Sequence, residues 1–86
     1  MGKQEPHNQD SAVFGRNLVR IMDKTKDERG NRTLVYQDIA NRTGIAQSLI
    51  VRYGNGQYRI SLENAKAIAR AVGRTVDEML DPDMEV

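Results

Sequence analysis

The chain has 86 residues, the size of one small domain with a modest hydrophobic core. It contains no cysteine, so neither a disulfide nor a cysteine-ligated metal can stabilise it, and a reducing compartment such as the cytoplasm is expected. No apolar run approaches the length of about 18 residues that a membrane span requires. The N-terminal residues also lack the apolar core of a secretion signal, so we expect neither membrane insertion nor export.

The net charge is only +1, but the charges are unevenly distributed along the chain. Residues 29–59 contain five arginines and a single acid, Asp38, whereas residues 75–86 contain five acids and no base. We interpret the basic middle as a surface for a polyanion and the acidic end as a surface for solvent or a partner. The alternative is that these charges only decorate a solvated surface.

The first ten residues are polar and are expected to form a disordered tail. Ser11 is a plausible N-cap for a first helix over about residues 12–24. The apolar side chains of this segment recur at helical spacing and predict a stripe that faces the core: Phe14, Leu18, Ile21 and Met22. Arginine and lysine side chains follow one another every four residues on another face, which we interpret as solvated.

A wholly polar loop is expected over residues 25–33, and its Arg29 and Arg32 are candidates for contacts with phosphates. A second helix should follow at about residues 35–42, capped by Thr33 or an earlier polar residue, Asn31. Tyr36 at the start of this helix has two interpretations that the sequence leaves open. Its hydroxyl donates to a phosphate, or its ring packs against the first helix.

The chain is organised around residues 36–56, where two short segments of helical apolar spacing flank a break at Gly44. Glycine adopts the left-handed conformation of a helix C-cap without steric cost, so Gly44 predicts the end of one helix. A third helix is expected over about residues 46–54, opening with Gln47 and Ser48. This pattern is typical of a helix-turn-helix, in which the second helix points its N-terminal side chains at base edges.

These residues resemble the helix-turn-helix of the Cro and lambda-repressor-like (XRE-type) family, and the similarity covers about residues 12–80. It consists of a small residue in the first helix, a glycine at the turn, an aliphatic residue in the second helix, a Gln-Ser pair that opens it and an Asn-Gly pair after it: Ala40, Gly44, Ile50, Gln47-Ser48 and Asn55-Gly56. The resemblance implies an all-α, compact five-helix bundle that binds double-stranded DNA. The long loop at residues 25–33 and the absence of a polar cap at Ala46 depart from the family pattern.

In the third helix, Ile50 and Tyr53 should face the core, and Leu49 should lie exposed on the flank. The resemblance implies base contacts for Gln47, Ser48, Val51 and Arg52. Glutamine suits adenine and arginine suits guanine, each good bidentate pair giving about 1–3 kcal/mol of discrimination. The expected contacts with the DNA backbone are Tyr36, Arg29, Arg32, Arg42, Asn55 and Arg59.

One local alternative is a β-hairpin over residues 50–60, because two β-prone runs flank Asn55-Gly56, a strong hairpin signal. A winged fold would use such a hairpin. It would also shorten the third helix to a few residues, so we favour the helical interpretation.

A fourth helix is expected over residues 62–72, capped by Ser61, with a buried stripe of Leu62, Ala65, Ile68, Ala69 and Val72. Thr75 and Glu78 have the spacing of a capping box and predict a last short helix that ends near Leu80. The domain boundaries are therefore a tail at 1–10, a DNA-binding domain at 11–81 and an acidic tail at 82–86.

Catalysis is not expected. His7 is the only histidine, and neither a second histidine nor a cysteine is present to complete a metal site. The serines have no plausible base, and residues 54–56 are too short for a phosphate-binding loop. The sequence therefore predicts no cofactor and no metal.

The favoured hypothesis is a cytoplasmic, sequence-specific transcriptional regulator. By family habit it is a repressor of bacterial, plasmid or phage origin that binds a palindromic operator as a homodimer. One alternative is an antitoxin whose acidic end engages a basic toxin. Another is a helix-turn-helix that binds only proteins.

Overall fold

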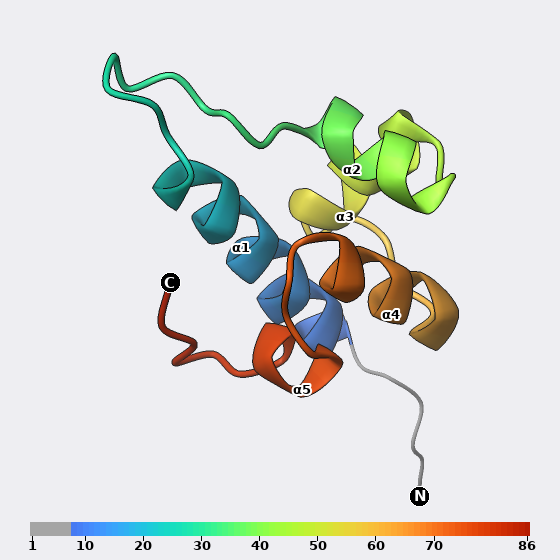
Figure 1. Cartoon of the computed structure of the whole chain (residues 1–86). Coiled ribbons are helices and arrows are strands. Elements are labelled where there is room, and N and C mark those ends of the chain that lie inside the picture. Colours follow the sequence, from blue (N-terminus) through green and yellow to red (C-terminus); the bar gives the residue numbers. More distant parts are fainter. Residues whose placement is uncertain (1–7) are drawn as a thin grey trace, which may run out of the picture.

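The computed structural model describes residues 8–86, which form five helices joined by loops and contain no strand (Figure 1). The helices are α1 (Asn8–Lys24), α2 (Tyr36–Thr43), α3 (Gln47–Gly54), α4 (Leu62–Ala71) and α5 (Val76–Met79). The all-α five-helix architecture expected from the sequence is confirmed. The hairpin alternative is wrong, because its residues lie in α3 and in the loop before α4.

The core forms where α1 crosses α3, with α2 and α4 packed together beside this crossing and α5 closing the end (Figure 1). Helix α1 contributes the expected stripe, and every other helix contributes at least one buried side chain. The largest fully buried apolar residues are Phe14, Leu18, Met22, Ile39, Ile50, Ile68 and Met79. Packing against α1 and α2 thus fixes the position of α3 through its inner face.

The crossing of α1 and α3 depends on Gly15. A Cβ atom built on Gly15 would lie 2.0 Å from the carbonyl oxygen of Tyr53, which is far inside van der Waals contact. The two helix backbones therefore approach each other directly at this point. Only the absence of a side chain permits this distance.

Helix α1 begins at Asn8, four residues before the expected start, so Ser11 is not its N-cap. Ser11 is instead buried within the helix, and its Oγ accepts a 3.1 Å hydrogen bond from the backbone N–H of Ile60. The hydroxyl thus pairs with a backbone N–H of the α3–α4 loop. The residues next to Ser11 in the sequence do not indicate this contact, because Ile60 lies 49 positions away. Residues 1–7, which include His7, lie outside the described residues.

Helix α2 begins at Tyr36, and neither Thr33 nor Asn31 caps it; both cap expectations are wrong. The Thr33 hydroxyl donates to the carbonyl oxygen of Thr25 at 3.1 Å and so closes the base of the loop instead. The cap position is Val35, whose N–H donates to the Asp38 carboxylate at 3.0 Å. A carboxylate in the first turn therefore stabilises this helix end.

Two expectations about burial are wrong. Leu49 is partly buried and packs against the core rather than lying exposed. Leu62, the first residue of α4, is 63% exposed rather than part of its buried stripe. The rest of the stripe is confirmed: Ala65, Ile68 and Ala69 are buried and Val72 is partly buried.

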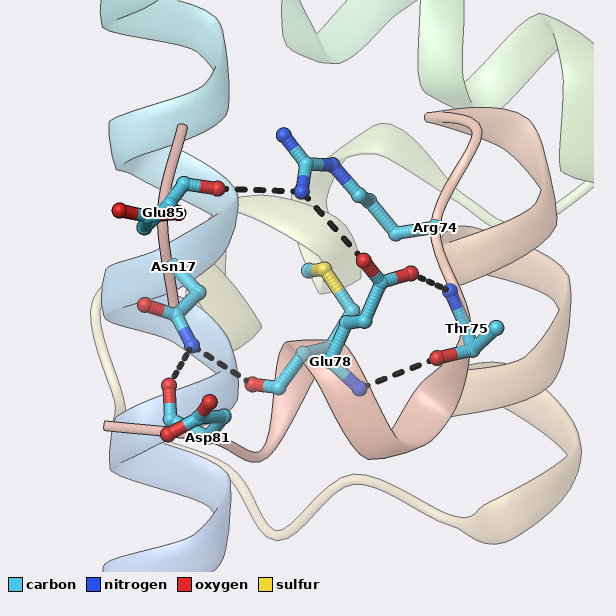
Figure 2. Close-up of polar contacts among 7 residues, drawn as sticks. Asn17, Arg74, Thr75, Glu78, Asp81 and Glu85 are labelled. Carbon is cyan, nitrogen blue, oxygen red and sulfur yellow. Dashed lines mark hydrogen bonds and ion pairs between the residues drawn. The ribbon is translucent and has the colours of Figure 1, made fainter. Parts of the chain in front are cut away.

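The end of the chain is packed onto the domain (Figure 1). The side-chain amide of buried Asn17 donates to the carbonyl oxygens of Met79 at 2.9 Å and Asp81 at 2.8 Å (Figure 2). Met84 is only 4% exposed and belongs to the core. Residues 82–86, expected as an acidic tail, therefore lie against α1.

Candidate nucleic-acid interface

The turn between α2 and α3 is built from local hydrogen bonds. Gly44 adopts φ = 77°, and its N–H donates to the carbonyl oxygen of Ala40 at 2.9 Å. The Thr43 hydroxyl donates to the carbonyl oxygen of Ile39 at 2.8 Å and accepts from the N–H of Ile45 at 3.1 Å. These bonds end α2 and set the direction in which α3 begins, as the glycine signal predicts.

Helix α3 is anchored through its inner face. Ile50 is fully buried and Tyr53 nearly so. The Tyr53 hydroxyl accepts a 2.9 Å hydrogen bond from the side-chain amide of Asn64 on α4. The inward positions of these two side chains agree with the sequence prediction, and they hold α3 against both α1 and α4.

The outer face of α3 carries the side chains expected to contact bases. Gln47, Ser48 and Arg52 are exposed and Val51 is partly exposed. The pairs Gln47/Val51 and Ser48/Arg52 each have the i, i+4 spacing of neighbours on one helix face. No side chain forms a capping hydrogen bond at Ala46, and the first turn of α3 has no acid, so the helix dipole there favours a negatively charged group.

Tyr58 contacts Arg52 at the end of this face. Arg52 Nη1 donates a 2.6 Å hydrogen bond to the Tyr58 hydroxyl, and the guanidinium carbon lies 5.0 Å from the ring centroid. Sequence reasoning assigned no role to Tyr58. The only signal was an aromatic residue six positions after an arginine across a Gly-Asn-Gly turn.

Tyr36 packs at the C-terminal end of α3. A Cβ atom built on Gly54 would lie 2.2 Å from the Tyr36 hydroxyl oxygen, so the ring fills the space that this glycine leaves. Burial raises the pKa of Tyr36 above its ordinary value; Arg32 lowers that pKa and Asp23 raises it. The hydroxyl therefore stays protonated and remains a hydrogen-bond donor at neutral pH.

Arg42 and Arg32, both expected at the DNA backbone, contact other parts of the protein. Arg42 Nη1 donates to the carbonyl oxygen of Ala71 at 2.9 Å and so stabilises the C-terminal end of α4. Arg32 forms an ion pair with Asp23, which ties the loop to the end of α1. Arg32 and Arg42 are both exposed. Each also has a structural role that the sequence did not indicate.

The three remaining backbone candidates are exposed. Arg29 lies in the projecting α1–α2 loop, where its N–H and that of Asn31 donate to the Asp27 carboxylate, both at 2.9 Å. Asn55 is the C-cap residue of α3, and Arg59 follows in the α3–α4 loop. The structure thus places Asn55 and Tyr36 at the end of α3, while Arg29, Arg32 and Arg42 lie on other elements.

The described part of the chain shows neither a metal site nor a membrane-spanning helix. Within residues 8–86, no group of three or more histidine, cysteine, aspartate or glutamate side chains could hold a metal ion. None of the described helices is long and apolar enough to cross a membrane.

Two short helices joined through a left-handed glycine, the second with an exposed polar face, define a helix-turn-helix domain. A family model described as helix-turn-helix matches residues 26–79, which is more than half of the chain. The chain therefore belongs to the XRE-type, lambda-repressor-like helix-turn-helix family, whose members bind DNA. No curated protein and no solved structure matches the chain.

Proposed function

We propose that this protein is a sequence-specific transcriptional regulator, and a repressor of bacterial, plasmid or phage origin, that inserts α3 into the major groove. The observation that carries the proposal is the exposed face of Gln47, Ser48, Val51 and Arg52 on a helix anchored by its opposite side. Anchoring matters because a base contact discriminates only when the side chain is held in register with the base edge.

Under this proposal, Gln47 and Ser48 contact bases from the first turn of α3. Glutamine presents both a donor and an acceptor, which matches the N6 and N7 edge of adenine. Val51 lies one turn further along the same face and offers an apolar contact for a thymine methyl group. Arg52 supplies the guanidinium donors that match guanine.

The part of the DNA affinity that does not depend on base sequence comes from cationic and hydrogen-bond-donating side chains around α3. The proposed backbone contacts are Tyr36, Arg29, Arg32, Arg42, Asn55 and Arg59. Each arginine that neutralises a phosphate releases condensed counterions, so binding should weaken steeply as salt rises. Arg32 and Arg42 can serve phosphates only with the donors that their protein partners leave available.

A domain this small covers too little DNA for tight specific binding, so the proposal includes a homodimer on a palindromic operator. Two copies of α3 would then enter successive major grooves, with half-sites about 34–36 Å apart. The proposal also includes a cytoplasmic location, no cofactor and no catalytic activity.

The experiment that tests this function is selection of bound duplexes from a random library at moderate salt. A palindromic consensus would support sequence-specific binding by a dimer. Sequence-independent binding, or no binding, would contradict it and leave a protein-binding role as the better interpretation.

The first prediction concerns Gln47→Ala. The variant should lose discrimination at one base pair of each half-site by about 1–3 kcal/mol, because the bidentate contact to that base disappears. Competition titrations with operators changed at one base pair at a time measure this loss. Arg29→Ala serves as the matched control, and it should weaken all duplexes alike and flatten the salt dependence. Equal losses on operator and random DNA for Gln47→Ala would contradict its assigned role.

A further inference from the structure

Arg52 is held in place before any DNA is present. It lies on the exposed face of α3, and Tyr58 reaches it from the α3–α4 loop. The hydrogen bond from Arg52 Nη1 to the Tyr58 hydroxyl is 2.6 Å long, and the guanidinium carbon lies 5.0 Å from the ring centroid. Two contacts of different kinds, one to the hydroxyl and one to the ring, therefore restrain the same group.

Such restraint has an entropic cost for a side chain at a surface. An exposed arginine has many rotamers, and fixing it in one of them costs conformational entropy. Tyr58 is itself 45% exposed, so the pair is not held by burial. The orientation of Arg52 is thus defined by Tyr58 rather than by the core.

The contact leaves the recognition edge of Arg52 available. Its hydrogen bond to Tyr58 uses Nη1, and within the described residues no protein acceptor binds Nε or Nη2. Nε–H and Nη2–H are parallel donors on one edge of the planar guanidinium, the geometry that matches O6 and N7 of guanine. Arg52 itself lies one helical turn after Ser48 on the exposed face of α3.

We propose that Tyr58 is a positioning residue of the DNA interface, which fixes the Arg52 guanidinium so that its Nε–Nη2 edge contacts a guanine. The inference rests on the proposed function, because it assigns Tyr58 a role in reading the operator. Tyr58 contacts no base itself and acts through Arg52. Pre-orienting the donor removes part of the ordering cost that binding would otherwise carry.

The test compares Arg52→Ala, Tyr58→Phe, Tyr58→Ala and the double variant Arg52→Ala/Tyr58→Ala in the full chain. Gln57→Ala is the matched control, because Gln57 is an exposed residue of the same loop. Each variant is titrated against the selected operator and against operators changed at one base pair. Thermal unfolding by circular dichroism shows that every variant is folded.

Arg52→Ala should reduce discrimination at one guanine-containing base pair by about tenfold or more. Tyr58→Ala should reduce discrimination at that same base pair, and Tyr58→Phe should do so by about threefold, since it retains the ring but loses the hydroxyl bond. In the Arg52→Ala background, Tyr58→Ala should cause no further loss. Gln57→Ala should leave every base preference unchanged. A merely structural role for Tyr58 would not select one base pair.

The inference is overturned if the Tyr58 variants keep wild-type discrimination at the base pair that Arg52→Ala affects. It is also overturned if Arg52→Ala weakens all duplexes alike, which would make the pair a phosphate contact. Failure of the proposed function is a separate result: the wild-type protein would then select no consensus at all.

Discussion

Gly15 shows how a residue without a side chain determines the position of the helix proposed to read DNA. Its missing Cβ lets the backbone of α1 approach the carbonyl oxygen of Tyr53, and Tyr53 anchors α3 in the core. Any side chain on Gly15 would push the two helices apart. The outer face of α3 would then shift relative to the rest of the domain.

We predict that Gly15→Ala is destabilising, whereas Gly54→Ala costs less. At Gly15 the new Cβ meets rigid backbone at 2.0 Å, and overpacking of this kind typically costs about 1–3 kcal/mol, more than the gain of about 1 kcal/mol in helix propensity. At Gly54 the nearest atom is the Tyr36 hydroxyl oxygen at 2.2 Å, the far end of a side chain that can rotate. Urea unfolding at equal protein concentration measures both changes.

The same measurement has an internal control. Adding Tyr36→Phe to Gly54→Ala removes the hydroxyl that causes the closest overlap, so it should recover part of the lost stability. Tyr36→Phe has no such contact with Gly15 and should not rescue Gly15→Ala. Equal losses for the two alanine variants, or equal rescue, would contradict this account of the crossing.

Sequence reasoning missed these residues for a physical reason. Gly15 lies inside a helical pattern, where a glycine looks like a weak helix former. Its role appears only when the distant residue Tyr53 is placed beside it. For the same reason Asn17 was missed and Ser11 was given the wrong role, that of an N-cap, since each side chain binds backbone groups that lie far away in the chain.

Individual helix ends were predicted well where the signal is local. Gly44 ends α2, the Ser61 hydroxyl caps α4, and a capping box opens α5, as the sequence indicates. Each of these caps is formed by residues only a few positions apart, so the residue types in that short stretch are enough to predict it. The start of α2 was predicted less well, because Thr33 takes part in closing a loop rather than in capping the next residues.

The capping box of α5 predicts a dependence of stability on pH. The Glu78 carboxylate accepts a 2.9 Å hydrogen bond from the N–H of Thr75, and the Glu78 N–H donates to the Thr75 hydroxyl at 3.1 Å (Figure 2). The hydrogen bond from the Thr75 N–H to the carboxylate is the main reason that the pKa of Glu78 lies below its ordinary value. The Thr75 side chain and Arg74 lower this pKa further. The folded state therefore binds the proton of Glu78 less readily than the unfolded state does.

A group with a lowered pKa in the folded state stabilises the fold above its unfolded pKa, about 4.3 for glutamate, and this contribution is lost as pH falls through the folded value. We predict that Glu78→Gln is less stable than the wild type at neutral pH and that the difference shrinks in acid. Urea unfolding between pH 7 and pH 3 measures this convergence. Glu28→Gln, in the exposed α1–α2 loop, is the control. A difference that stays constant with pH would contradict the role given to the Glu78 charge.

On the scale of the whole molecule, the C-terminal segment completes the fold. Met84 reaches the core, and Arg16 donates to the carbonyl oxygen of Pro82 at 3.3 Å. Arg74 donates to the carbonyl oxygen of Glu85 at 3.1 Å and lies 3.6 Å from the Glu78 carboxylate (Figure 2). The acidic end that the antitoxin alternative assigns to a toxin is thus held against the folded domain.

We predict that Met84→Ala lowers the free energy of unfolding by about 2–5 kcal/mol, because it removes a buried side chain and leaves a cavity. Asp83→Ala, at the exposed neighbouring position, should change stability by less than about 0.5 kcal/mol. Thermal and urea unfolding of both variants provide the comparison. A neutral Met84→Ala would show that the segment is not part of the cooperative unit.

The architecture was predictable and parts of the proposed interface were not. Apolar spacing, the Gly44 turn and the cap residues Ser61 and Thr75 predicted the five helices, because each of these signals lies within a short stretch of sequence. The partners of Arg42, Arg32 and Arg52 depend on how loops and helix ends pack against one another in the folded protein. The local sequence does not indicate these tertiary contacts. The base-contact residues themselves remain a prediction.

The hydrogen bond between Ile60 and Ser11 has a consequence for how the protein meets its target. It ties the loop after α3 to α1, while Tyr53 and Asn64 tie α3 to α4. The surface offered to DNA is therefore shaped during folding, and little further ordering is needed on contact. Under the proposed function, a duplex with the wrong sequence would meet a surface that is already ordered, so a mismatch should appear chiefly as a shorter residence time.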